Sequence, residues 1–427
     1  MEPIVLSSVT LDIFDHTPTI TIHQLETLAS QRSRASKCTC TLNITSLTPR
    51  RDSTRLKECV RFLRWEPSVN AAEACVRTHL ASAISSLENV GSVMWAIVNP
   101  QTPQFSNHIG RRWTMNEHDP HWARQSVSDA LTSLRFLKNL KLILPGSVYN
   151  LTLNGLHLNW LIHLEKISVS GACDNYDSII VSEVAGAIEK SLSLAHLEVH
   201  YPRDYPPPVE NFLAKRSPEM HLRFSHVSIA DMNYSFRVKP HLHALRSLEL
   251  TNTAPYHRPL ESLAESRGLM TEIYKSLADE RILLSRIVID DVFPVLLDYL
   301  SSYSGILTEI SIICLYKPVP WKELDELAVR FYTFILPKHI GSLEILDISP
   351  MFTCEWCFNP KKQSLFSQAR RLRSLSISFA FADLSVTNPN LPVDYALDDA
   401  VRGPLSGIWD SLKKNPSFRY LPLCNSH

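Results

Sequence analysis

Glycine is scarce in this chain, with 11 glycines among 427 residues. A nucleotide-binding fold needs several tight turns in which glycine lets the backbone approach phosphate, so this scarcity argues against one. No glycine-rich phosphate loop occurs, and the Gly-x-Ser-x-Gly pattern of a nucleophile elbow is absent from the sequence. We therefore expect a protein that is not an enzyme and that needs no cofactor, with neither catalytic nor metal-binding residues.

Neither sign of charge is in excess, because 43 basic residues balance 43 acidic ones. No net field attracts nucleic acid or an anionic membrane surface, so we expect neither as a partner. Hydrophobic residues make up 44% of the chain and charged residues 20%. This composition is typical of a globular protein and argues against a disordered one.

Long apolar runs are missing as well. No segment offers the roughly 18 uncharged apolar residues that a membrane-spanning helix needs. The opening, MEPIVLSSVTLDIFDHTPT, lacks an apolar stretch of signal-peptide length. The nine cysteines are an odd number for a disulfide framework and are scattered, which favours reduced, mostly buried thiols. We expect a soluble monomer of the cytoplasm or nucleus.

What the chain does contain is a repeated spacing of leucine and isoleucine. In HLHALRSLELTN, residues 241–252, leucines stand at 242, 245, 248 and 250. This spacing of three, three and two fits neither a plain helix nor a plain strand. The first residue of the final apolar pair recurs at positions 93, 140, 167, 197, 227, 248, 287, 310, 346 and 375. The intervals run from 21 residues (227 to 248) to 47 (93 to 140), and most lie at or above the ~20 to 29 residues of a leucine-rich repeat.

The segments between these units have helical spacing. DPHWARQSVSDALTSLRFL opens with a helix-start signal, VFPVLLDYLSSYSG ends on a glycine, and PVPWKELDELAVRFYTFILPKH repeats apolar residues every three or four positions. One strand and helix cannot bury their apolar sides alone, so neighbouring units stack and the end units act as caps. The sequence predicts an α/β fold, an irregular leucine-rich-repeat solenoid (horseshoe) with a parallel concave sheet and helices on the convex side.

The repeat is poorly defined near the N-terminus. There CTCTLNI predicts a short strand, and TIHQLETLASQ and NAAEACVRTHLASAISSL predict helices. We assign residues 1–86 to an N-terminal cap or to divergent first repeats. Residues 87–427 are assigned to the leucine-rich-repeat solenoid, with a C-terminal cap from about residue 395.

Three phrases carry a family resemblance. VFPVLLDYLSSYSGILTEISI, ELAVRFYTFILPKHIGSLEILDI and the upstream HWARQSVSDALTSLRFLKNLKL resemble leucine-rich-repeat proteins of basidiomycete fungi, over roughly residues 85–420. Many members carry an N-terminal F-box, a short helical module that docks on the adaptor subunit of a cullin ubiquitin ligase, while the repeats select the substrate. The resemblance therefore implies an F-box-like ubiquitin-ligase adaptor.

The usual F-box opening, a LPxE-like start into a leucine-rich helical run, is not found in the first 40 residues. What remains is the substrate-recognition part. Three explanations are open: this member lost the F-box, the sequence is truncated, or the protein works alone. A degenerate F-box between Thr19 and Leu63 would add the ligase adaptor as a partner. The alternative is a stand-alone interaction protein without a ligase role.

Strand alternation locates the candidate binding surface. Residues beside the buried apolar positions must point to the inner face of the curve, where we expect a protein partner. The His196, Glu198, His200 strand beside His226 is the best local candidate for a pH-sensitive or protein-binding patch. The predicted protein-binding residues are Lys141, Lys166, Ser168, His196, Glu198, His200, His226, Glu249, Arg286, Asp290, Glu309 and Asp347.

CEWC at 354–357 is the sharpest local motif. Two thiolates flanking two residues can bind zinc or form a redox pair. A structural zinc needs a second pair of ligands nearby, and a thioredoxin-like unit has no room within the repeats. Coincidental thiols are therefore the favoured interpretation, and a zinc or thiol enzyme using Cys354 and Cys357 is the alternative.

Three weaker motifs have simpler explanations. NEHDPHW gathers Glu117, His118, Asp119 and His121, a conceivable metal cluster that more closely fits a polar loop with an N-cap. His241 and His243 are expected in a turn or on the surface. YPPPV at 205–209 fits a stiff loop better than a polyproline ligand.

Overall fold

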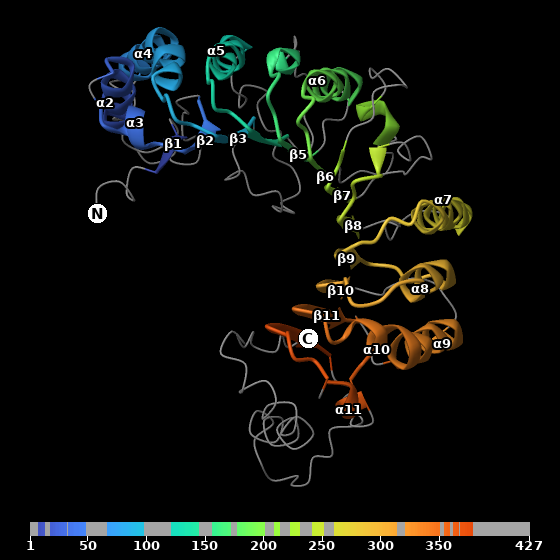
Figure 1. Cartoon of the computed structure of the whole chain (residues 1–427). Coiled ribbons are helices and arrows are strands. Elements are labelled where there is room, and N and C mark those ends of the chain that lie inside the picture. The colour runs from blue at the N-terminus through green and yellow to red at the C-terminus, as the bar shows by residue number, and fades with distance from the viewer. Residues whose placement is uncertain are drawn as a thin grey trace, which may run out of the picture. The chain divides into compact units, whose positions relative to one another are not determined.

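A computed structural model describes the fold (Figure 1). The described residues are 7–12, 18–31, 33–47, 66–97, 121–144, 156–171, 177–200, 209–213, 223–230, 241–251, 260–313, 321–350, 354–358, 362–366 and 368–378. The chain divides into two compact units. The first comprises Met1–Arg203 and Pro207–Leu222, and the second comprises Asp204–Pro206 and Arg223–His427.

The first unit alternates strands and helices. Its strands are β1 (Ser8–Asp12), β2 (Thr41–Ser46), β3 (Ser92–Ala96), β4 (Asn139–Ile143), β5 (Lys166–Ser170) and β6 (His196–His200). Its helices are α2 (Pro18–Ala29), α3 (Ala35–Cys38), α4 (Glu66–Ser85), α5 (His121–Thr132) and α6 (Asp177–Lys190), with 3-10 turns η2 (Leu158–Trp160) and η3 (Val209–Phe212). Each strand pairs in parallel with the next along the chain, and the helices lie on one side of the sheet (Figure 1).

The second unit repeats this plan. Its strands are β7 (His226–Ala230), β8 (Ser247–Thr251), β9 (Arg286–Ile289), β10 (Glu309–Ile313), β11 (Ile345–Ser349) and β12 (Ser374–Ile377). Its helices are α7 (Leu260–Asp279), α8 (Pro294–Ser301), α9 (Trp321–Arg330), the π-helical turn η5 (Phe331–Ile335), α10 (Leu336–His339) and α11 (Gln363–Phe366). Pairing is again parallel and sequential, with helices on one side (Figure 1).

The predicted α/β architecture with a parallel sheet is confirmed. Each of the ten positions of the leucine repeat is the second residue of a strand, from Val93 in β3 to Leu375 in β12. β2 coincides with the strand predicted from CTCTLNI, whereas β1 was not predicted, because no leucine-rich turn precedes it. The boundary at residue 86 remains a prediction, and the C-terminal cap expected from residue 395 lies outside the described residues.

The spacing of three, three and two arises because two leucines lie in the turn before the strand and two lie on the strand itself. Leu242 and Leu245 lie in the turn before β8, and Leu248 and Leu250 lie on the strand. All four are buried, with exposures of 6%, 1%, 3% and 1%. A fully buried leucine contributes about 1.5 to 3 kcal/mol through removal of apolar surface from water. The turn and the strand of each repeat thus supply a common core under the helices.

The helix predicted across residues 318–339 is interrupted. After α9 the backbone widens into the π-turn η5, where the Leu336 N–H donates to the Phe331 carbonyl, five residues earlier. Pro337 explains this, since it lacks an N–H and its ring clashes with the carbonyl four residues before it in a regular helix. The wider turn accommodates the proline and keeps Phe331, Tyr332 and Ile335 buried.

The expectation of mostly buried thiols is wrong for the described cysteines, whereas His241 and His243 lie where they were expected. Among the described cysteines only Cys357 is buried, and none of the five forms a disulfide, so these thiols are not mostly buried. His241 lies in a turn as expected but is only 7% exposed and packs edge-on against Phe224 with ring centroids 6.3 Å apart. His243 does lie on the surface, with Nδ1 3.4 Å from Oε2 of Glu280. Separately, no helix in the described part of the chain is long and apolar enough to cross a membrane.

Candidate protein-binding face

The side of each sheet that faces away from the helices is formed by the first, third and fifth residues of the strands, and we call it the polar face. In β4, for example, Leu140 and Leu142 are buried while Asn139 and Lys141 are exposed. This alternation follows from the two-residue period of a strand. Eleven of the twelve predicted residues occupy such positions, and Asp290 directly follows β9. Ser168 is an exception in accessibility, since it is only 5% exposed.

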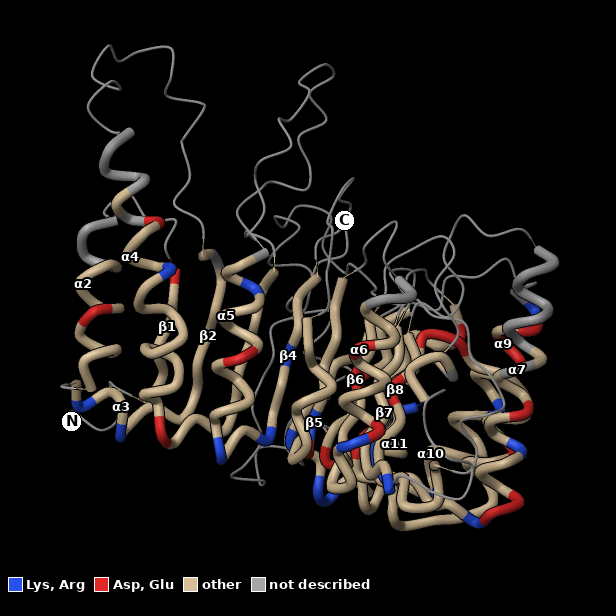
Figure 2. The backbone as a smooth tube through the Cα atoms, turned by 90° about the horizontal axis from the view of Figure 1, so that it is seen from above, with Lys and Arg blue, Asp and Glu red and all other residues tan. Residues whose placement is uncertain are grey.

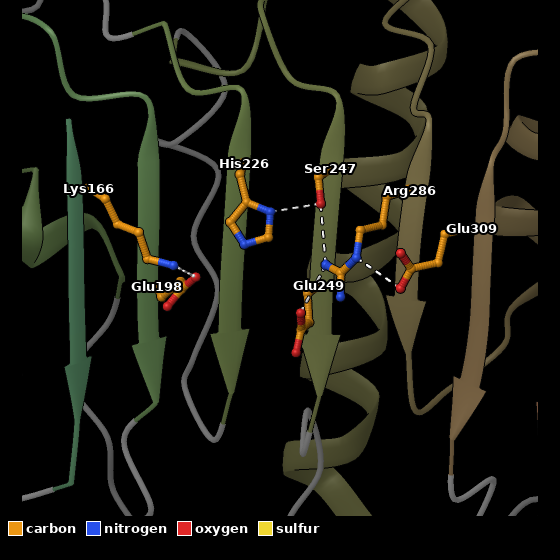
Figure 3. Close-up of polar contacts among 7 residues, drawn as sticks. All are labelled: Lys166, Glu198, His226, Ser247, Glu249, Arg286 and Glu309. Atoms are coloured by element: carbon orange, nitrogen blue, oxygen red, sulfur yellow. Dashed lines mark hydrogen bonds and ion pairs between the residues drawn. The ribbon is translucent and has the colours of Figure 1, made fainter. Parts of the chain in front are cut away.

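In the first unit, charge gathers on β4 to β6. The first and third strand positions of β1 to β3 are Ser8, Thr10, Thr41, Asn43, Ser92 and Met94, none of which is charged. Lys141, Lys166 and Glu198 follow on β4, β5 and β6, and the Lys166 ammonium group forms an ion pair with the Glu198 carboxylate (Figure 3). His196 and His200 are exposed at the two ends of β6. The sequence therefore placed these side chains correctly along β6.

In the second unit, Arg286 is the centre of a polar cluster that crosses four strands (Figure 3). Its Nη1 donates to Oε2 of Glu249 at 3.0 Å and to Oγ of Ser247 at 3.3 Å. Its Nε lies 2.9 Å from Oε1 of Glu309. Nδ1 of His226 in turn lies 2.7 Å from the Ser247 hydroxyl. We call these five residues the Arg286 cluster.

Strand register explains how the cluster assembles. His226, Ser247, Arg286 and Glu309 are direct partners across β7 to β10, so their side chains share one row. Glu249 belongs to the next row, two residues along β8. Because neighbouring strands are about 4.8 Å apart, one guanidinium can bind a carboxylate on either side. Strand alternation assigns Ser247 to the inner face, but it was not among the predicted binding residues, although its register between His226 and Arg286 would have indicated it.

The Arg286 cluster is half-buried and contributes little to folding. The Arg286, Glu249 and Glu309 side chains are 29%, 28% and 19% exposed. Ion pairs with this much solvent access typically stabilise a fold by about 0.2 to 1 kcal/mol. Their main effect is to fix the direction of the charged groups on the polar face.

The two units present different charges on this face. At the first and third strand positions, the second unit has three acidic residues, Glu249, Glu309 and Asp347, and one basic residue, Arg286, a formal charge of −2 (one minus three). The corresponding positions of the first unit give +1, from Lys141 and Lys166 against Glu198, and Asp12 at the fifth position of β1 brings this unit to zero. By contrast, basic and acidic residues are interspersed along α4 and α5 (Figure 2). The polar face of the second unit therefore carries an excess of negative charge.

The two cysteines of CEWC lie in a tight turn whose central tryptophan belongs to the core. Trp356 is fully buried, its indole N–H donates to the Leu324 carbonyl at 3.1 Å, and its own carbonyl accepts from the Tyr332 hydroxyl at 2.8 Å. The Lys362 ammonium group donates to the Cys357 carbonyl at 2.7 Å. These contacts give the motif a structural role.

The Cys354 thiol is not activated as a nucleophile. The hydrogen bond to Cys357 and then burial raise the pKa of the Cys354 thiol far above its ordinary value. A nucleophilic or redox-active cysteine needs a lowered pKa, because the thiolate is the reactive species. Within the residues that the structure describes, no third Cys, His, Asp or Glu ligand gathers with Cys354 and Cys357.

The remaining motifs cannot be placed. Glu117, His118 and Asp119 lie outside the described residues, as do the side chain of His121 and residues 205–208 of YPPPV.

No protein-family model matches the chain, and no curated protein matches it. Function must therefore be inferred from the fold and from the polar face.

Proposed function

We propose that this chain is an irregular leucine-rich-repeat protein, without enzymatic activity, that binds a protein partner on its polar face. The regular recurrence of a leucine-rich turn, a short parallel strand and a returning helix supports the repeat type. Such repeats expose the side of their sheet that carries no helices, and this surface is the usual place for a partner.

The Arg286 cluster is the observation that carries the proposal. A face that is merely solvated needs no fixed side-chain geometry, whereas here one guanidinium is held between two carboxylates from adjacent strands. Fixing these groups before binding reduces the entropy that association would otherwise cost. Arginine is also among the residues most often found to dominate binding energy at protein interfaces.

The chemistry of the cluster indicates the kind of partner. Glu249 and Glu309 share one arginine, so their two negative charges are only partly compensated. Asp347, on β11, adds a further carboxylate at the third strand position. We propose that this part of the face binds a lysine- or arginine-bearing segment, because complementary charge accelerates encounter and selects the correct partner.

A finer proposal is that the chain selects substrates for a cullin ubiquitin ligase, which rests on the resemblance to fungal F-box proteins. One observation favours the stand-alone alternative. Thr41–Ser46, within the segment where a degenerate F-box would have to lie, forms β2 and pairs in parallel with β1 and β3. An F-box is a helical module, so a sheet strand in this segment favours a protein that recognises its partner without the ligase adaptor.

Site-specific photo-cross-linking in a fungal lysate tests the proposal. A photoreactive residue is placed in the full-length chain at Ser228 or Ser376, on the polar face, or at Lys275 or Thr333, exposed on the helical side. We expect the same partner in adducts from both face positions and not in adducts from the helical positions. Adducts from the helical side alone would refute the proposed surface. Cullin and its adaptor among the captured proteins would support the ligase role, and their absence would support the stand-alone role.

A further inference from the structure

We propose that Glu26, Cys75 and His79 form a binding site for a zinc-like transition-metal ion between α2 and α4 of the first unit. Each residue offers one ligand atom, a carboxylate oxygen, a thiol sulfur and an imidazole nitrogen, and these three atoms all lie within 4.8 Å of one another. This group was not predicted from the sequence, because Glu26 and Cys75 are 49 residues apart.

Two packed helices build the site. Cys75 and His79 are four residues apart on α4, so their side chains lie on one helix face, one turn apart. Glu26 reaches this face from α2, which packs against α4. The Cys75 sulfur lies 3.7 Å from Oε1 of Glu26. A hydrogen bond from the Cys75 thiol to the Glu26 carboxylate accounts for the proximity of these two groups. It does not account for the presence of His79 at the same place.

The donor set matches zinc better than the common hard cations. Thiolate sulfur, imidazole nitrogen and carboxylate oxygen are the three ligand types that zinc binds, whereas calcium and magnesium require oxygen ligands. Tetrahedral zinc with bonds of ~2.0 to 2.3 Å separates its ligand atoms by roughly 3.3 to 3.8 Å. The Cys75 sulfur and the Glu26 oxygen already have this spacing, and the other pairs need to approach by at most about 1.5 Å, a shift of the size that rotation about side-chain bonds produces.

The site is open to solvent, and solvent or a neighbouring side chain can supply a fourth ligand. Glu26 is exposed, and Cys75 and His79 are intermediate in burial, so an ion can reach it. Nδ1 of His23, one turn before Glu26 on α2, lies 3.8 Å from the second carboxylate oxygen, Oε2. The fourth position is thus filled by water or, after rotation of its exposed side chain, by His23. In either arrangement the bound ion links α2 to α4.

Cobalt titration of the full-length protein, first stripped with a chelator, tests this site. We expect one cobalt ion per chain with a thiolate-to-cobalt charge-transfer band, displaced by zinc. Cys75→Ser and His79→Gln should each weaken binding by at least about tenfold. The matched controls Cys40→Ser and His163→Gln alter an exposed cysteine and an exposed histidine elsewhere in the unit and should leave affinity unchanged.

A second measurement separates lost binding from lost folding. At the same concentration, zinc should raise the unfolding temperature of the native protein and of both controls more than that of the Cys75 variant. Cobalt binding without the charge-transfer band, or with equal affinity in Cys75→Ser, would overturn the proposal. The result does not depend on the polar face, since Glu26, Cys75 and His79 lie on the helices.

Discussion

Replacing Gly171 by alanine should destabilise the first unit through a backbone clash. Gly171 follows β5 with φ +93°, and a Cβ there would lie 2.3 Å from the Leu144 carbonyl oxygen. Its N–H donates to the His200 carbonyl at 3.0 Å, and the Leu144 N–H donates to Ser170 at 2.7 Å. A non-glycine residue with left-handed backbone costs about 1 to 2 kcal/mol. Each of the two hydrogen bonds that must shift adds about 0.5 to 1.5 kcal/mol, so we expect a total loss of about 2 to 5 kcal/mol.

Hydrogen exchange of the backbone amides of β4, β5 and β6, measured in increasing urea, gives the unfolding free energy of the first unit. Gly91→Ala is the matched control, because Gly91 directly precedes β3 and its added Cβ would meet nothing closer than the Phe136 carbonyl oxygen at 3.5 Å. We expect the control to change the unfolding free energy by less than about 1 kcal/mol. Equal effects of the two substitutions would refute the reasoning from close approach.

Three further predictions concern buried and half-buried side chains. Trp356→Ala should lower the free energy of urea unfolding by about 3 to 5 kcal/mol, because a fully buried indole and its hydrogen bond to the Leu324 carbonyl are lost. A loss below 1 kcal/mol would contradict a core role for CEWC. Burial lowers the pKa of His339, which is fully buried with Nε2 2.9 Å from the Leu300 carbonyl oxygen. The unfolded chain then binds more protons below about pH 6.5, so the unfolding free energy should fall as the pH drops from about 7 to 5. His339→Gln should reduce that slope, and an unchanged slope would count against the prediction. Arg286→Ala should change the unfolding free energy by about 1 kcal/mol or less, because the paired side chains keep 19–29% of their surface in solvent; a loss above 3 kcal/mol would show the cluster to be structural.

Strand positions could be predicted because the repeat fixes them. Each leucine-rich turn leads into a strand at a constant offset, so Leu248 and its nine counterparts mark the second residue of β3 to β12. The period of two then assigns every neighbouring residue to the core or to the polar face. For this reason the sequence predicted which side chains lie on the polar face without any knowledge of the connecting segments.

Contacts between neighbouring repeats of one unit could not be predicted, because they depend on strand register and on helix packing. Arg286 meets Glu249 across 37 residues of sequence, and only the pairing of β8 with β9 brings them together. The metal-ligand group depends on how α2 packs against α4, for which the sequence has no signal. The π-turn at Phe331–Ile335 was likewise missed, although Pro337 inside a helical pattern is a recognisable cause.

The central claim is that the polar face binds a protein partner through the charges around Arg286. The most direct test compares the affinity of the cross-linked partner for Glu249→Gln/Glu309→Gln with that for Glu272→Gln/Glu326→Gln, two exposed glutamates on α7 and α9. Both double variants remove two negative charges without changing side-chain volume. We expect the face variant to lose at least about tenfold in affinity, or 1.4 kcal/mol, and the helical variant to bind like the native protein. Equal affinity of the two variants would contradict the claim.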